Sequence, residues 1–285
     1  MPRPRDAHHG VTRTAFAPAG GFVTTPLTLT GERTGPGIWH ENYWFRRHEV
    51  AYAAVPGFVA ALTSRAPSTV LDAGSGEGYA AELLGRAWPG SRVVGVDYDA
   101  AATAHAARAH AGEHAAYLRG ALTALPVADA MFDVTVSMQV LEHIWTPEEF
   151  VRELARVTRP GGALVLSTPN RLTFSPGLGR REVPANAYHC REYDATELAG
   201  ELARWLPGAQ VTLHGVHHGG RLTDWAQAHG PVEEALAAAQ PAGWPAVVRA
   251  LVESVTAQDF ALGEASDDCL DLVAVVANPA RTVRG

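Results

Sequence analysis

The sequence predicts an α/β fold in which helices cover both faces of a mostly parallel sheet. Short runs rich in β-branched residues alternate with helix-like segments, which is typical of parallel sheets with crossover helices. The strand-like runs are 69–71, 93–96, 134–137 and 164–167, and the helix-like segments are 79–86, 100–110 and 147–157. A chain of 285 residues that is 47% hydrophobic can bury one large core of this kind.

The flanking segments predict additions to this core. Residues 1–36 are rich in Pro, Gly and Thr and are predicted to form a flexible leader. Apolar residues recur at helical spacing over 37–66, so we expect an N-terminal helical lid of one or two helices, with Pro56 breaking or kinking the run. The catalytic core is expected over 67–216 and 266–279, interrupted by a long loop at 170–187. Alanine-rich segments over 217–265 predict a helical cap inserted before the last strand.

Charge and cysteine content exclude several function classes. The net charge is −7 and basic residues form no run, so nucleic acid is not an expected partner. Cys190 and Cys269 lie far apart and have no metal-ligand spacing, so we predict reduced thiols and no metal site. The histidines of the segment 105–114 are expected at the surface. Without a long apolar stretch or a signal-like N-terminus, the chain is expected to be soluble, cytoplasmic and free of membrane contact.

A glycine-rich turn follows the first predicted strand, the position where α/β sheets bind ligands. Residues 74–78 read G-x-G-x-G, which is not the G-x-G-x-x-G of dinucleotide-binding proteins. Asp72 and Glu77 flank the turn, and their charges would oppose a pyrophosphate at this helix N-terminus. S-adenosylmethionine carries an ammonium and a sulfonium instead of a phosphate, so these acids favour it. Asp97 ends the second strand at about the 20-residue spacing expected of an acid that accepts hydrogen bonds from a ribose.

Four segments in this order resemble the motifs of class I S-adenosylmethionine-dependent methyltransferases. They are VLDAGSGEGYAAELL, VVGVDYD, LPVADAMFDVTVSMQVLEHI and ELARVTRPGGALVLSTPN, and together they cover about residues 69–170. The resemblance implies a Rossmann-like fold with a seven-stranded sheet and S-adenosylmethionine as cofactor. It also implies a set of cofactor contacts: Asp72, Gly74, Ser75, Gly76, Gly78 and Gln139 around the methionine part, Asp97 at the ribose and Tyr98 at the adenine. Family members often place an acid at the position of Ala121, so the adenine contact here is expected to fall to the backbone near Leu122.

A second, shorter resemblance covers the N-terminal segments TGERT (30–34) and ENYWFRRHE (41–49). They are similar to lead-in segments of actinobacterial methyltransferases, including mycofactocin oligosaccharide methyltransferases. This resemblance implies that Tyr43 and either Arg46 or Arg47 cover the cofactor, with an Arg fork pairing with its carboxylate. Burial of the aromatic residues in a helix core is the alternative.

Two histidines are candidate catalytic bases. His143 follows the fourth strand at the edge of the sheet that faces the ligand, and His189 ends the long loop. Either could accept the proton of an acceptor hydroxyl, or only stabilise its loop. We therefore predict O-methylation of a small metabolite, sugar, glycan or natural product.

Rival functions and assemblies stay open from the sequence. Nitrogen or carbon is the alternative methyl acceptor, and an inactive cofactor-binding regulatory protein is the alternative from another class. An NAD-dependent oxidoreductase is disfavoured by the spacing of the glycines and by Asp72. The alanine-rich cap could also pair two copies of the chain in a homodimer.

Overall fold

The computed structural model describes residues 34–278, and the leader predicted over 1–36 lies almost wholly outside them. In the described part, eight strands form one sheet in the order β3-β2-β1-β4-β5-β8-β6-β7. The strands are β1 (Thr69–Ala73), β2 (Arg92–Asp97), β3 (Ala115–Arg119), β4 (Phe132–Met138), β5 (Thr158–Pro169), β6 (Gln210–His218), β7 (Phe260–Glu264) and β8 (Asp271–Ala277). The pairs among β1 to β5 are parallel, and β8, β6 and β7 add an antiparallel half. The predicted α/β class with a mostly parallel core is confirmed.

The predicted count of seven strands is wrong by one, because β7 lies inside the segment assigned to the helical cap. It pairs antiparallel with β6, with Phe260 opposite His218. This strand is short and lies at the edge of the sheet, and only Phe260 of its residues is buried. Its sequence therefore lacks the alternating apolar pattern that reveals a half-buried strand.

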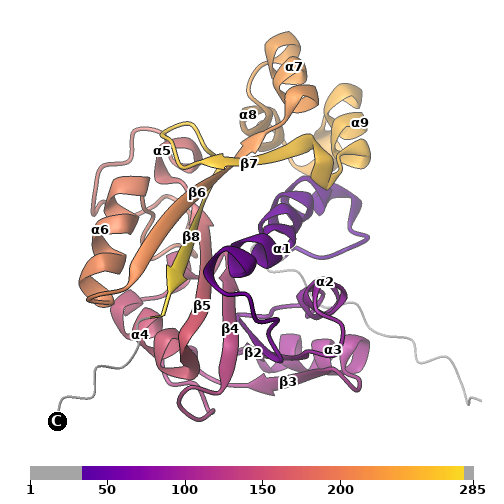
Figure 1. Cartoon of the computed structure of the whole chain (residues 1–285). Helices are drawn as coiled ribbons and strands as arrows, with labels where there is room; N and C mark the ends of the chain where they lie inside the picture. Colours follow the sequence, from indigo (N-terminus) through magenta and orange to yellow (C-terminus); the bar gives the residue numbers. More distant parts are fainter. Residues whose placement is uncertain (1–33, 279–285) are drawn as a thin grey trace, which may run out of the picture.

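Helices cover both faces of the sheet, as predicted (Figure 1). They are α1 (Asn42–Leu62), α2 (Ala80–Ala87), α3 (Ala100–His110), α4 (Pro147–Val157), α5 (Arg171–Phe174), α6 (Ala195–Trp205), α7 (Gly220–His229), α8 (Val232–Ala237) and α9 (Ala246–Ser254). One apolar cluster joins the sheet to α1, α2 and the cap helices α8 and α9. A second cluster joins the opposite face to α4 and α6. Each of these helices buries an apolar stripe, which fixes the sheet between two layers.

The lid segment forms one helix, α1, which passes through Pro56 without ending. Proline removes one backbone hydrogen bond, but buried Val55 and Val59 hold this part of the helix on the core. Near the other end, the buried guanidinium of Arg47 donates two hydrogen bonds to Asp271 of β8, at 2.6 and 2.5 Å. Helix α1 is thereby fixed to the last strand as well as to the helical layer.

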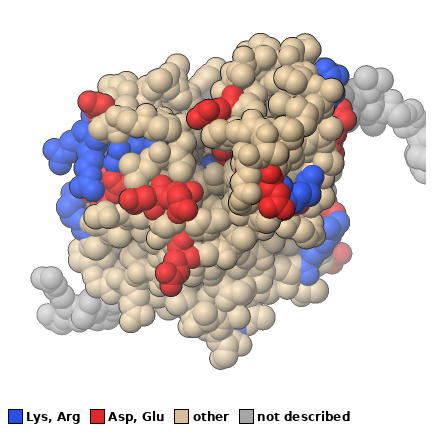
Figure 2. Space-filling view, turned by 90° about the horizontal axis from the view of Figure 1, so that it is seen from above, with Lys and Arg blue, Asp and Glu red and all other residues tan. Residues whose placement is uncertain are grey.

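The cap helices α7, α8 and α9 stand together at one end of the molecule, next to β7 (Figure 1). Figure 2 looks onto this end, where a hollow separates two raised parts and a group of Arg side chains lies to one side. The predicted long loop after β5 contains a short helix, α5, whose first turn is capped by the Asn170 side chain at 3.2 Å from the Leu172 amide. Of the helices between residues 34 and 278, none has the length and apolar character to cross a bilayer.

Candidate active site

The glycine turn after β1 lies against the carboxyl end of β2. The amides of Gly74 and Ser75 both donate to the Val96 carbonyl, at 2.7 and 3.1 Å. Gly74 has φ +86°, and a β-carbon on it would lie 2.4 Å from a methyl group of Val140. Only glycine fits here, because the backbone is left-handed and a neighbouring side chain occupies the space.

A cavity of about 560 Å³ opens between this turn, the ends of β2 and β4, and one face of α1. Its size lies within the range of small-molecule sites. Eight of the predicted site residues line it: Gly74, Ser75, Gly76, Asp97, Tyr98, Leu122, Gln139 and His143. The sequence-based list missed Thr34, His48, Tyr52, Tyr79, Trp145 and Tyr188, which also line it. The turn and the strand ends thus form the half of the cavity that the motifs predicted.

Two buried acids give this cavity its electrostatic character. Asp97 accepts hydrogen bonds from the amides of Gly76 and Asp99, both at 2.9 Å. Asp72 is only 1% exposed and lies behind the cavity wall, where it accepts a hydrogen bond of 3.1 Å from the Tyr52 hydroxyl. Burial raises the pKa of Asp72 to about 7, although the hydrogen bond from Tyr52 opposes this shift. A positively charged ligand would favour its ionised form, as the sequence predicted for S-adenosylmethionine.

Aromatic and apolar side chains form the rim of the cavity. Tyr98 is 71% exposed and Trp145 is 86% exposed, and both line the opening together with Leu122 and Ile144. Large exposed aromatic rings beside a cavity are suited to cover the flat face of a purine. Of these residues, Tyr98 and Leu122 are the ones that the sequence predicted to contact the adenine.

Tyr43 and Arg46 do not line this cavity, so the structure does not bring them to the place where the resemblance put them. The hydroxyl of buried Tyr43 donates to Glu233 of the cap and lies 2.7 Å from a ring nitrogen of His218. Arg46 bonds to neighbours on its own helix, including Glu49 at 2.7 Å. A different face of α1 points toward the ligand cavities.

That face carries Trp44, His48 and Tyr52, which follow one another at intervals of four residues and so share one side of a helix. His48 and Tyr52 line the first cavity. Burial lowers the pKa of His48 to about 4, so this imidazole is neutral at physiological pH. The four-residue spacing was the signal in the sequence that could have identified this stripe.

A second, smaller cavity of about 220 Å³ adjoins the first. Both are lined by Thr34, His48, Gln139 and His143. His189 lines the second cavity, and its ring lies 5.0 Å from that of His143 and is stacked on Phe174. The two candidate bases, which are far apart in the sequence, therefore meet beside the first cavity.

Hydrogen bonds orient both imidazoles. Nδ1 of His189 lies 2.7 Å from a carboxylate oxygen of buried Glu192. Nδ1 of His143 lies 3.0 Å from the Tyr188 carbonyl. Because a carbonyl and a carboxylate only accept hydrogen bonds, Nδ1 is the donor in each case, and in the neutral ring Nε2 then carries the lone pair. Each ring is held in the tautomer that a general base requires.

Two groups of side chains in the described range place three potential metal-ligand atoms within 4.8 Å of one another. The first consists of Glu142, His143 and His189 and lies at the second cavity. Burial raises the pKa of the Glu142 carboxyl. The second group consists of Glu77, His105 and His110 and joins the glycine turn to α3.

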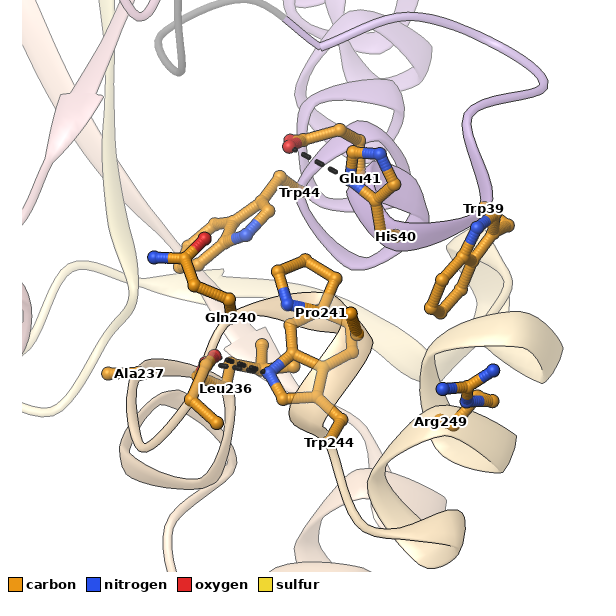
Figure 3. Close-up of a pocket in the computed structure, with 12 residues that line it drawn as sticks. Trp39, His40, Glu41, Trp44, Leu236, Ala237, Gln240, Pro241, Trp244 and Arg249 are labelled. Atoms are coloured by element: carbon orange, nitrogen blue, oxygen red, sulfur yellow. Dashed lines mark hydrogen bonds and ion pairs between the residues drawn. The ribbon is translucent and has the colours of Figure 1, made fainter.

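A third cavity, of about 820 Å³, lies between the start of α1 and the cap (Figure 3). Trp39, Trp44 and Trp244 line it, and the rings of Trp39 and Trp244 meet edge to face at 6.0 Å. Figure 3 shows Arg249 beside Trp39, and its guanidinium lies 5.2 Å from that ring. Glu41 and Trp44 line the second cavity as well, so the two cavities adjoin.

Comparison with known proteins identifies the family. Residues 71–166 match the methyltransferase domain family. The chain is 42% identical over 261 residues to a "Probable S-adenosylmethionine-dependent methyltransferase" of Mycobacterium tuberculosis, covering 89% of this chain and 90% of that protein. A similarly named protein of Mycolicibacterium smegmatis is 43% identical over 273 residues, covering 90% of this chain and 97% of that protein.

Solved structures agree at the level of the fold. A SAM-dependent methyltransferase from Thermotoga maritima superposes with a TM-score of 0.54 at 17% identity, over 83% of this chain and 93% of that one. One from Mesorhizobium loti gives a TM-score of 0.51 at 18% identity, over 79% and 97%. Together with the acidic, glycine-walled cavity, these relatives show that the chain belongs to the S-adenosylmethionine-dependent methyltransferases and is an enzyme of the Rossmann-like class I fold.

Proposed function

We propose that this methyltransferase transfers the methyl group to a hydroxyl oxygen of a small molecule or glycan. The observation that carries the proposal is the position of His143 and His189 in the second cavity. This cavity shares a wall with the first cavity, where the cofactor is expected to bind. The sulfonium already activates the methyl group, so the protein mainly aligns the reactants and excludes water. A hydroxyl acceptor must also lose a proton, and an imidazole in the right tautomer can accept it.

The residues of this chain divide the remaining tasks. Asp97 binds the ribose of the cofactor, the glycine turn surrounds its methionine part, and Gln139 lies at the wall common to both cavities. The backbone of Gln139 has a positive φ of 56° and its amide donates to the Ser167 carbonyl at 3.0 Å, so the side chain is held at the junction. The methyl group would cross from the first cavity to the second at this point.

The tryptophan-lined third cavity supports an acceptor larger than the second cavity alone could hold. A sugar or another natural product with an apolar face could place its reacting hydroxyl near His143 and rest its distal part against Trp44 and Trp39. Glu41 lines both compartments and offers a hydrogen-bond acceptor between them.

The test uses S-adenosylmethionine with a labelled methyl group and a metabolite extract of the source organism. We expect a product that carries the label on oxygen, located by mass spectrometry and NMR. The variants His143→Ala and His189→Ala are compared with His114→Ala, which replaces an exposed histidine outside the three cavities. Loss of the general base is expected to lower the rate by about 100-fold or more in at least one of the first two variants.

Calorimetry with S-adenosylhomocysteine shows whether each variant still binds the cofactor product. A label on nitrogen or carbon would contradict the proposal. Undiminished rates in both His143→Ala and His189→Ala would contradict the role of the histidines and leave the methyltransferase family assignment intact.

A further inference from the structure

We propose that Glu77, His105 and His110 bind a divalent transition-metal ion behind the glycine turn (residues 74–78). Nε2 of His105 lies 2.9 Å from the Glu77 carboxylate, and Nε2 of His110 lies 3.0 Å from the same oxygen. The three side chains are between 15% and 20% exposed, so both histidines are mostly covered and do not occupy the open surface expected from the sequence. They converge on one carboxylate from a single helix.

The local sequence explains why these groups meet. His105 lies within α3 and His110 is its last residue, whereas Glu77 lies in the turn between Gly76 and Gly78. A β-carbon on Gly78 would lie 2.7 Å from the β-carbon of Ala106 and 3.1 Å from the His110 ring. Because glycine has no such atom, the turn packs closely on α3 and brings the carboxylate to both imidazoles.

The spacing of the ligand atoms fits a metal ion. Bonds of about 2.0–2.1 Å from a transition metal to nitrogen or oxygen place neighbouring ligand atoms roughly 2.9–3.4 Å apart. The carboxylate-to-imidazole distances of 2.9 and 3.0 Å lie in this range, and all three ligand atoms lie within 4.8 Å of one another. A small adjustment of the two rings would therefore close the site around an ion.

The donor set also selects the class of ion. Two imidazoles and one carboxylate suit Zn²⁺, Co²⁺ or Ni²⁺, whereas Mg²⁺ and Ca²⁺ prefer oxygen ligands alone. In the metal-free protein each Nε2 donates its proton to Glu77, because the carboxylate only accepts. On metal binding that proton moves to Nδ1 or to solvent, and water completes the coordination on the partly exposed side.

A metal at this place would couple to the cofactor. Glu77 also lines the first cavity, and the amide of the preceding Gly76 bonds to Asp97 at 2.9 Å. Fixing Glu77 to α3 would hold the turn in its ligand-binding conformation before the cofactor arrives. By linkage, the metal and the cofactor should each raise the affinity for the other. This inference is independent of which atom of the acceptor receives the methyl group.

The experiment titrates the full chain, freed of metals by a chelator, with Co²⁺ followed by visible absorption and with Zn²⁺ followed by calorimetry. We expect one ion per chain. His105→Ala and His110→Ala should each weaken metal binding at least about tenfold. Even the loss of a residue that only hydrogen-bonds a metal ligand typically costs about that much. His114→Ala, which replaces an exposed histidine shortly after α3, is the matched control and should bind like the parent.

Cofactor coupling gives an independent readout that also applies to Glu77→Gln, which keeps the size of the side chain. Saturating Zn²⁺ should tighten binding of S-adenosylhomocysteine at least about fivefold in the parent and leave it unchanged in the three ligand variants. Equal metal affinity in the parent and in folded His105→Ala and His110→Ala overturns the proposal. So does absence of metal binding in the parent, or binding that is lost only in Glu142→Gln at the other histidine cluster.

Discussion

Replacing Asp72 by Asn should stabilise the cofactor-free enzyme at pH 8 and weaken its binding of the cofactor. Asp72 is almost fully buried, and this burial raises its pKa from 3.8 to about 7. Each pKa unit corresponds to about 1.36 kcal/mol, so the shift of about 3 units amounts to about 4 kcal/mol at most. Asn keeps a carbonyl oxygen for the Tyr52 hydroxyl but carries no charge.

Proton binding determines whether the stability of the protein rises or falls with pH. The folded protein holds the Asp72 proton more tightly than the unfolded chain, so this group's contribution to stability is complete below about pH 4 and is lost as the pH rises to about 7. Asp72→Asn removes this loss. The difference in unfolding free energy between variant and parent should therefore grow in favour of the variant from pH 5 to pH 7, and then level off by pH 8.

The assay is urea unfolding of both proteins without cofactor at pH 5, 6, 7 and 8, with Asp224→Asn, an exposed carboxyl on α7, as the matched control. Calorimetry at pH 8 should show S-adenosylhomocysteine binding weakened about tenfold, or about 1.4 kcal/mol, because its ammonium loses the nearby negative charge of Asp72 behind the cavity wall. A stability difference that does not change between pH 5 and pH 8 would refute the assignment of this shifted pKa to Asp72.

Three further substitutions test the fold around the cavities. Gly74→Ala should cost about 1–3 kcal/mol in backbone strain, with a further cost from the clash with Val140, and should abolish binding of S-adenosylhomocysteine measured by calorimetry. Asp271→Asn removes the carboxylate that hydrogen-bonds the buried Arg47 and leaves only Glu233, at 4.0 Å, to balance its charge, so the unfolding free energy in urea should fall by about 3–5 kcal/mol. Trp145→Ala removes an exposed ring at the rim, so stability should stay within about 0.5 kcal/mol. Its affinity for S-adenosylhomocysteine should fall about 3- to 10-fold, the equivalent of one lost aromatic contact.

Each of these expectations has a contrary outcome. Normal cofactor affinity in Gly74→Ala would mean that the turn can move away from Val140. Parent-like stability of Asp271→Asn would show that water or another group compensates the Arg47 charge. Unchanged affinity in Trp145→Ala would remove this ring from the adenine side of the cavity.

The parallel half of the fold could be predicted from the sequence because each of its elements carries a complete local signal. Helices α3 and α4 begin and end at the predicted residues, 100–110 and 147–157. Strand β5 is longer than the predicted 164–167, because Thr158 pairs with Phe132 of β4 at its start and Thr168 and Pro169 pair with β8 at its end. The strand β7 could not be found, since an exposed edge strand buries too little to leave an apolar pattern.

The candidate site also has a part that could be predicted from the sequence and a part that could not. Asp97 was predicted from its place at the end of a strand, because a parallel sheet brings its carboxyl ends to one edge, whereas Gln139 was predicted from the resemblance of its segment to a methyltransferase motif, and both line the first cavity. The face of α1 could not be chosen correctly from the aromatic run around Tyr43, because which side of a helix meets the ligand depends on how the helix docks. Here the hydrogen bonds from Arg47 to Asp271 of β8 and from Tyr43 to Glu233 of the cap fix the rotation of α1 and turn His48 toward the cavities.

One helix supplies part of the wall of every compartment described for this enzyme. Trp44 lines the second and third cavities, and His48 lines the first and second. Tyr52 lines the first cavity and donates a hydrogen bond to Asp72 behind the glycine turn. A rotation of α1 by even a few degrees would move all three side chains together. Under the proposed function, changing the acceptor through this helix would therefore also alter how firmly the methyl donor is retained, and the cap side of the third cavity is the better place to vary for a new acceptor.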